Sequence, residues 1–159
     1  MLKIEKYNHA SSVYQLSKKV LTTINLSDSV GSLNRETIFI EDICKRVEKS
    51  KTVLYVLKYQ ESLIGLVAMS ATSIKDQPSM QIDYIFVNKE YRSKKLDFLD
   101  SCKPFRYLID LSISIAKDIQ AQIGLRYIVL APDNDDIKSK YEQVGFSNLD
   151  DDWMFLKLD

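Results

Sequence analysis

The sequence is poor in the residues on which several kinds of enzyme chemistry depend. Its 159 residues include one histidine, His9, and two cysteines, Cys44 and Cys102. A single imidazole excludes chemistry that requires several, and a Ser-His-Asp triad would have to use His9, at the edge of a predicted helix. The cysteines lack metal-ligand spacing, so we expect free thiols in a reducing compartment, the cytoplasm, and no metal site.

Long apolar runs and net charge are also missing. No stretch approaches the ~18 apolar residues of a membrane-spanning helix. The first five residues carry no apolar signal segment, so we expect no membrane partner. Lys plus Arg and Asp plus Glu number 22 each, and this net charge of zero leads us to expect no nucleic-acid partner. The composition, 45% hydrophobic and 28% charged, is typical of one globular domain over residues 1–159.

Hydrophobic periodicity predicts strands and helices along the whole chain. The predicted strands cover 2–7, 52–59, 63–74, 80–87, 126–131 and 153–158, with an extra strand near 146–149. The predicted helices cover 9–24, 36–49, 105–122 and 135–143, and we expect 25–34 to form a loop. The order β-α-α-β-β-β-α-β-α-β predicts an α/β (α+β) fold, in which a mixed central sheet carries helices on both faces.

Single glycines and a proline mark features within these elements. Gly65, inside a predicted strand, indicates a bulge or a close approach of another backbone. Pro104 suits the first turn of a helix. Gly124 stands where a helix C-cap glycine belongs.

A basic loop follows the strand predicted at 80–87. Lys89, Arg92, Lys94 and Lys95 lie between this strand and the next helix. Helix N-termini bind phosphates through free N–H groups, and basic side chains add charge-assisted hydrogen bonds to a pyrophosphate. The segment therefore predicts a phosphate site, and the alternative is a solvated basic surface loop.

A second candidate segment follows the strand predicted at 126–131. Asn134 is placed to cap the next helix, and Tyr141 lies two turns later on the same broad face. A tyrosine hydroxyl near a sulfur can give its proton to a leaving thiolate, which is general acid chemistry. The alternative is that Asn134 only caps the helix and Tyr141 only packs on the sheet.

Together the two segments resemble the GNAT N-acetyltransferase superfamily. The order strand, basic loop, helix, strand, Asn, helix, Tyr, Gly-Phe, strand matches that family from residue 2 to 158. The most specific part of the resemblance is Asn134-x6-Tyr141-x3-Gly145-Phe146.

The resemblance implies a role for each matching residue. Acetyl-coenzyme A would bind in a V-shaped opening between two splayed strands, 82–87 and 126–131. Backbone groups of the first strand would pair with the pantetheine arm like an added strand. Asn134 would steady this arm, and Tyr141 would protonate the coenzyme A thiolate. The implied cofactor-binding residues are Ile85, Phe86, Val87, Arg92, Ser93, Lys94, Lys95 and Asn134.

The phosphate loop departs from the family pattern. Lys95 and Asp97 stand where the family has small residues, which let backbone N–H groups approach the phosphates. The chain also has extra residues at about 96–103, which we expect to form a turn of their own and to move the start of the long helix to Pro104. Two consequences follow from this departure. Either lysines, Lys103 among them, hold the phosphates by charge, or the site no longer binds coenzyme A.

The acceptor amine must be neutral to attack, so a base is needed. Asp83 is the first candidate, because it lies on the strand that leads to the pocket. Asp83 and Tyr84 alternate across the sheet, so only one of them can face the pocket. Glu36 and Glu41 on the second predicted helix are further options, and solvated carboxylates are the alternative for both.

The resemblance therefore predicts transfer of an acetyl group from acetyl-coenzyme A to a primary amine. We expect direct attack in a ternary complex, because neither cysteine lies where it could reach the thioester. The expected acceptor is a small molecule or a peptide, and the expected assembly is a monomer or homodimer. One alternative is a catalytically silent GNAT-like fold that acts as a binding or regulatory module. Another is a protein contact through Leu96, Phe98 and Leu99.

Overall fold

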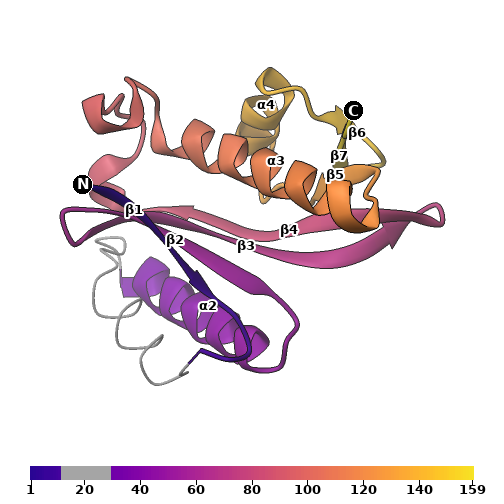
Figure 1. Ribbon diagram of the computed structural model, residues 1–159. Helices are drawn as coiled ribbons and strands as arrows, with labels where there is room; N and C mark the ends of the chain where they lie inside the picture. Colours follow the sequence, from indigo (N-terminus) through magenta and orange to yellow (C-terminus); the bar gives the residue numbers. More distant parts are fainter. Residues whose placement is uncertain (12–29) are drawn as a thin grey trace. The chain divides into compact units, whose positions relative to one another are not determined.

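The computed structural model describes residues 1–11 and 30–159 of the chain (Figure 1). The helix predicted over 9–24 lies almost wholly outside these residues. Among the described residues, no helix is both long enough and apolar enough to cross a membrane. The described elements are β1 (Leu2–Tyr7), α2 (Val30–Glu48), β2 (Val53–Tyr59), β3 (Ser62–Ile74), β4 (Gln77–Val87), η1 (Lys89–Tyr91), η2 (Asp97–Leu99), α3 (Pro104–Ile123), β5 (Tyr127–Leu130), α4 (Asp135–Gln143), β6 (Ser147–Asn148) and β7 (Met154–Lys157).

The strands form one mixed sheet, as the sequence predicted. Hydrogen-bonded neighbours follow the order β1-β2-β3-β4-β5-β7-β6. The pairs β1–β2 and β2–β3 are antiparallel, whereas β4 and β5 run parallel. The chain divides into two compact units. The first unit comprises Met1–Met69 and Tyr84–Leu108, and the second comprises Ser70–Asp83 and Ile109–Asp159.

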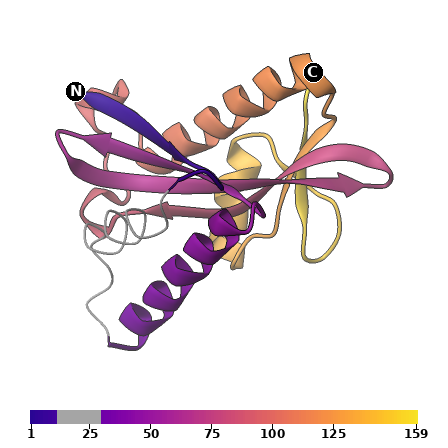
Figure 2. The same ribbon diagram turned by 60° about the horizontal axis from the view of Figure 1, so that its bottom comes forward.

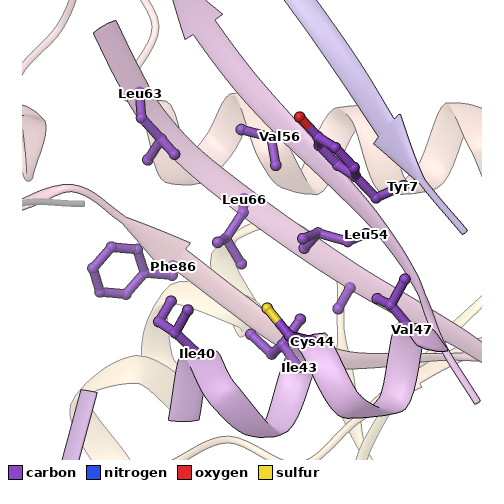
Figure 3. Packing of buried hydrophobic residues seen from close by; sticks show 11 residues of the cluster. Tyr7, Ile40, Ile43, Cys44, Val47, Leu54, Val56, Leu63, Leu66 and Phe86 are labelled. Atoms are coloured by element: carbon purple, nitrogen blue, oxygen red, sulfur yellow. The ribbon is translucent and has the colours of Figure 1, made fainter. Parts of the chain in front are cut away.

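An apolar core holds α2 against the strands of the first unit. Ile40, Ile43, Cys44 and Val47 recur at helical spacing, so one face of α2 buries all four of them (Figure 3). Both views of the chain show α2 beside β1 and β2 (Figures 1 and 2). Burying an aliphatic side chain of this size stabilises the fold by about 1.5–3 kcal/mol. The strands contribute Tyr7, Leu54, Val56, Leu63, Leu66, Ala68 and Phe86 to this core.

The second unit is built around β5. β5 pairs with β7, and β7 pairs with β6, the extra strand expected near 146–149. Just before β5, the N–H of Arg126 donates to Pro78 O and its carbonyl accepts from Leu158 N, both at 2.8 Å. α4 spans the residues predicted for it, Asp135–Gln143.

Two element starts differ from the prediction. α2 begins at Val30, within the segment expected as a loop, because the helix propensity of a few polar residues is a weak prior. β4 begins at Gln77 and includes Pro78, which was expected in a turn. Proline lacks an N–H, but the Pro78 carbonyl still accepts a hydrogen bond near the start of the strand. The predicted ends of α3 are confirmed, with Pro104 first and Gly124 at a φ of +72° just after it.

Candidate functional site

Gly65 brings β3 unusually close to β4, within the first unit. The β2–β3 register shifts between Leu57 and Lys58, so the strand bulges here. A Cβ added to Gly65 would lie 2.5 Å from the carbonyl oxygen of Phe86 and 3.4 Å from the Cα of Val87. The sequence offered a bulge or a close approach at Gly65, and the structure has both.

This contact fixes the direction of the backbone groups of β4. The carbonyl of Phe86 points toward β3, and so does the N–H of Asn88, which donates to Ile64 O at 2.8 Å. Successive residues of a strand direct their N–H and C=O groups to opposite edges. The backbone groups of Ile85 and Val87 therefore point to the other edge of β4, where an added strand or an amide ligand would pair.

Asn88, which sequence reasoning missed, ties the start of the basic loop to β3. Its side chain is buried, its Nδ2 donates to Leu63 O at 3.0 Å, and its Oδ1 accepts from the N–H of Lys89 at 3.2 Å. This side chain also caps η1. An asparagine directly after a buried strand is the signal that could have identified it.

Arg92 lies at the edge of β4 toward which the backbone groups of Ile85 and Val87 point. Its Nε donates to Val87 O at 2.8 Å, and its guanidinium lies 5.3 Å from the centroid of the Phe86 ring. A cation over an aromatic face is attracted by the ring quadrupole. These contacts use one N–H of the guanidinium, which carries five donors in all.

The rest of the predicted phosphate loop is exposed. Ser93, Lys94 and Lys95 all face solvent. Ser93 has a φ of +63°, so left-handed backbone falls one residue after Arg92. Lys95 and Asp97, which replace the family's small residues, do not adopt positive φ. The loop therefore forms without glycine, although each replacement adds a Cβ.

The extra segment folds into a closed loop of its own, as expected. Leu96 and Cys102 form an antiparallel bridge around η2. Leu99 is buried, and the ring of Phe98 stacks on Tyr59 at 3.9 Å with an interplanar angle of 2°. The hypothesis of a protein contact through Leu96, Phe98 and Leu99 is wrong for Leu99, which is buried; for the half-buried Leu96 and Phe98 it stays a prediction.

Asp83, the predicted base, lies in the second unit. Its Oδ1 accepts hydrogen bonds from Ser70 Oγ at 2.9 Å and from Gln81 Nε2 at 3.0 Å. Both donors come from neighbouring positions on β3 and β4. The carboxylate is therefore held in place, and one of its oxygens is already engaged.

Tyr84 faces the helix side of the first unit, and sequence reasoning gave it no role. Its hydroxyl donates to Asp42 Oδ2 of α2 at 2.6 Å. Its ring packs edge-on against Phe39, with the centroids 4.3 Å apart. Because side chains alternate along a strand, Asp83 points to the opposite face of β4. Of the two further candidates for the base, Glu41 is exposed on α2, and the side chain of Glu36 lies outside the described residues.

Asn134 caps α4, as the sequence predicted. Its Oδ1 accepts from the N–H of Ile137 at 2.9 Å, which satisfies one of the free donors at the helix start. The residue is exposed, and its Nδ2 group remains a donor.

Tyr141 is buried, on the same helix. Its ring packs against Phe146 at 5.6 Å, and the N–H groups of Val144 and Phe146 both donate to its carbonyl. Burial raises the pKa of the Tyr141 phenol, and the nearby Asp133 raises it further. The phenol therefore keeps its proton at neutral pH, as a general acid must.

The two cysteines are free thiols. Cys44 belongs to the apolar core, and burial, with a smaller contribution from Glu41, raises the pKa of its thiol to about 11. Cys102 lies in the closed loop and is half-buried. A buried, protonated thiol is a poor nucleophile, which supports the expectation of direct transfer.

The predicted site residues thus fall in both units. Ile85 to Lys95 belong to the first unit, whereas Asp83, Asn134 and Tyr141 belong to the second.

No protein-family model and no curated protein matches the sequence. Solved structures do match it. The crystal structure of AtaTR bound with acetyl-CoA aligns with a TM-score of 0.75 at 11% identity, covering 99% of this chain and 93% of that one. The KacTA–DNA complex gives 0.73 at 15% identity, with 99% and 94% covered. AtaT complexed with acetyl-methionyl-tRNAfMet gives 0.70 at 9% identity, with 99% and 95% covered. The fold is therefore GNAT-like, as the resemblance implied.

These neighbours correct the expected partners. One is complexed with an acylated transfer RNA, another with DNA, and a third with the C-terminus of an antitoxin. The expectation of no nucleic acid and of a small-molecule or peptide acceptor was therefore wrong. It rested on a net charge averaged over the whole chain, whereas polyanions respond to local charge. The segment from Lys89 to Arg106 contains six basic residues and only three acidic ones.

Proposed function

We propose that this chain transfers the acetyl group of acetyl-CoA to the primary amine of an aminoacylated transfer RNA. The observation that carries the proposal is the shared fold, which covers nearly all of this chain and of neighbours solved with acetyl-CoA and with acetyl-methionyl-tRNAfMet. The locally basic segment from Lys89 to Arg106 supports an acidic cofactor and a polyanionic acceptor.

The first unit offers groups that suit acetyl-CoA. Backbone N–H and C=O groups of Ile85 and Val87 at the edge of β4 would pair with the pantetheine amides. Arg92, Lys94 and Lys95 would hold the phosphates by charge, in place of the backbone contacts that a glycine loop supplies. For Val87 O to accept from the pantetheine arm, Arg92 would share this carbonyl or turn toward the phosphates.

α4 offers the other two groups. Asn134 uses its Oδ1 as the helix cap, so its Nδ2 would donate to a carbonyl of the pantetheine arm. Tyr141 would donate its phenolic proton to the departing sulfur as the amine attacks the acetyl carbonyl. The bond to sulfur breaks as the amide bond forms, without a covalent enzyme intermediate. Asp83 remains the predicted acceptor of the proton that the amine loses.

The test is acetyl transfer by the purified chain from acetyl-CoA to a pool of aminoacylated transfer RNAs. The release of the coenzyme A thiol is measured as the readout. The same pool after deacylation is the control for the amine. We expect thiol release only with the aminoacylated pool. No release with any aminoacyl-tRNA would overturn the proposal and favour the silent binding module.

Tyr141→Phe tests the acid in the same assay. We expect kcat to fall about 100-fold, since general acids contribute about 10²–10⁴ in rate. The KM for acetyl-CoA should be nearly unchanged. Tyr107→Phe, at a half-buried tyrosine of α3, is the matched control and should retain the wild-type rate. An unchanged rate in Tyr141→Phe would remove this residue from the acid role.

A further inference from the structure

Asp42 and Tyr84 form a polar pair that has no role in the reaction proposed above. Asp42 lies on α2, and Tyr84 on β4 directly precedes Ile85. The Tyr84 hydroxyl donates to Asp42 Oδ2 at 2.6 Å, a distance typical of a strong charge-assisted hydrogen bond between a hydroxyl and a carboxylate. Phe39 fixes the tyrosine ring from the edge, at 4.3 Å between centroids. Both partners are therefore held in one arrangement, although they lie near the surface.

The carboxylate of Asp42 still has capacity to accept hydrogen bonds. A carboxylate has about four lone-pair sites, and Tyr84 uses one of them on Oδ2. Asp42 is exposed, so its other sites face solvent. Asp83 is less available, because Ser70 and Gln81 both donate to one of its oxygens.

Asp42 lies beside the part of β4 that we assign to the pantetheine arm. Tyr84 and Phe86 direct their side chains toward α2, and Tyr84 directly precedes Ile85 on this strand. An acceptor amine must approach the acetyl group that the pantetheine arm would carry along this part of β4. Asp42 offers it a carboxylate that is both oriented and accessible.

We propose that Asp42, oriented by Tyr84, binds the α-amino group of the acceptor. This assignment rests on the proposed function, and it identifies Asp42 as the group that recognises the amine of the acceptor. Asp42 accepts hydrogen bonds from the amine, and Tyr84 is a positioning residue that keeps the carboxylate in place. The pKa of a free α-amino group is near 8, so near neutral pH the group is present as an ammonium and as a neutral amine. Both forms can donate a hydrogen bond to the Asp42 carboxylate.

The experiment measures binding without turnover, in the presence of coenzyme A instead of acetyl-CoA. The probes are a pool of aminoacylated transfer RNAs and the same pool after deacylation. Wild-type protein should bind the aminoacylated pool about 10–100-fold more tightly, the worth of one hydrogen bond to a charged group. Asp42→Asn should lose most of this preference and bind the deacylated pool as the wild type does. Glu48→Gln removes an exposed carboxylate from the same helix and should keep the preference.

Tyr84→Phe and the kinetics complete the test. Tyr84→Phe keeps the ring contact with Phe39, so we expect it to lose part of the preference. In acetyl transfer, Asp42→Asn should raise the KM for aminoacyl-tRNA at least tenfold, with little change in kcat, and Asp42→Glu should recover part of this loss. A wild-type preference in Asp42→Asn would overturn the assignment and leave the proposed function intact. Absence of acetyl transfer by the wild-type chain would overturn both.

Discussion

Burial raises the pKa of both Tyr141 and Tyr7, but the consequence differs between these two tyrosines. Tyr141 keeps its proton at neutral pH and can serve as an acid. Tyr7 lies in the core of the first unit and donates to Glu5 Oε2 at 3.0 Å, while Lys58 Nζ lies 2.8 Å from Glu5 Oε1. Burial, and then the Glu5 carboxylate, raise the pKa of Tyr7 to about 12. Tyr7, Glu5 and Lys58 therefore form a structural polar cluster between β1 and β2, in which the Glu5 carboxylate pairs with both the Tyr7 hydroxyl and the Lys58 ammonium.

Tyr7→Phe should lower the free energy of unfolding by about 1 kcal/mol at pH 7, the usual worth of one hydrogen bond. The folded-state pKa of Tyr7 is raised, so its contribution is complete below pH 10 and is lost as pH rises through 12. Urea titrations at pH 7, 9 and 10.5 would measure it. The difference between wild type and variant should be equal at pH 7 and 9 and smaller at pH 10.5. A difference that grows with pH would contradict this account.

At the scale of elements, the β3–β4 contact depends on Gly65. Gly65→Ala should lower the free energy of unfolding by about 1–3 kcal/mol, the usual cost of forcing extra atoms into a packed site. The added Cβ would lie 2.5 Å from Phe86 O, and a backbone atom cannot move away as a flexible side chain can. Because a displaced Phe86 would also shift its neighbours Ile85 and Val87, whose backbone groups at the other edge of β4 we assign to the pantetheine arm, the KM for acetyl-CoA should also rise. Thermal melts and initial rates would measure the two effects.

Gly124→Ala is the control for this substitution. Nothing lies within 4 Å of a Cβ added to Gly124, but its φ is +72°. Only backbone strain of about 1–2 kcal/mol should result. The KM for acetyl-CoA should stay at the wild-type value. Equal effects of the two variants on KM would contradict the role of the β3–β4 contact.

The sequence predicted those elements whose signals are local. Asn134 and Pro104 mark the starts of α4 and α3, because a cap and a proline act on the residues beside them. The start of α2 and the start of β4 were missed, since tertiary contacts override the weak propensities of polar residues and proline. For the same reason the pair of Tyr84 and Asp42 was not predicted: two elements far apart in sequence bring it together.

At the scale of the whole molecule, net charge proved a poor guide to partners. Equal numbers of acidic and basic residues conceal the basic segment at 89–106. A phosphate group responds to charges within about a Debye length, ~8 Å at physiological salt, so local excess decides binding. The proposed phosphate loop depends on local charge in the same way, because lysine in place of glycine would exchange backbone contacts for side-chain charge.

Acetyl-CoA at 100 times its Kd should stabilise the folded chain by about 2.7 kcal/mol, which for a domain of this size raises Tm by about 5–10 °C. Lys94→Gln/Lys95→Gln should reduce this shift, because we assign phosphate contacts to these lysines. The Tm without cofactor should not change, since both side chains are exposed. Lys117→Gln/Lys157→Gln, also exposed, removes the same charge elsewhere and should keep the full shift. Differential scanning fluorimetry would measure all three proteins. A full shift in Lys94→Gln/Lys95→Gln would assign the phosphates to other groups, and no shift in the wild type would contradict the cofactor itself.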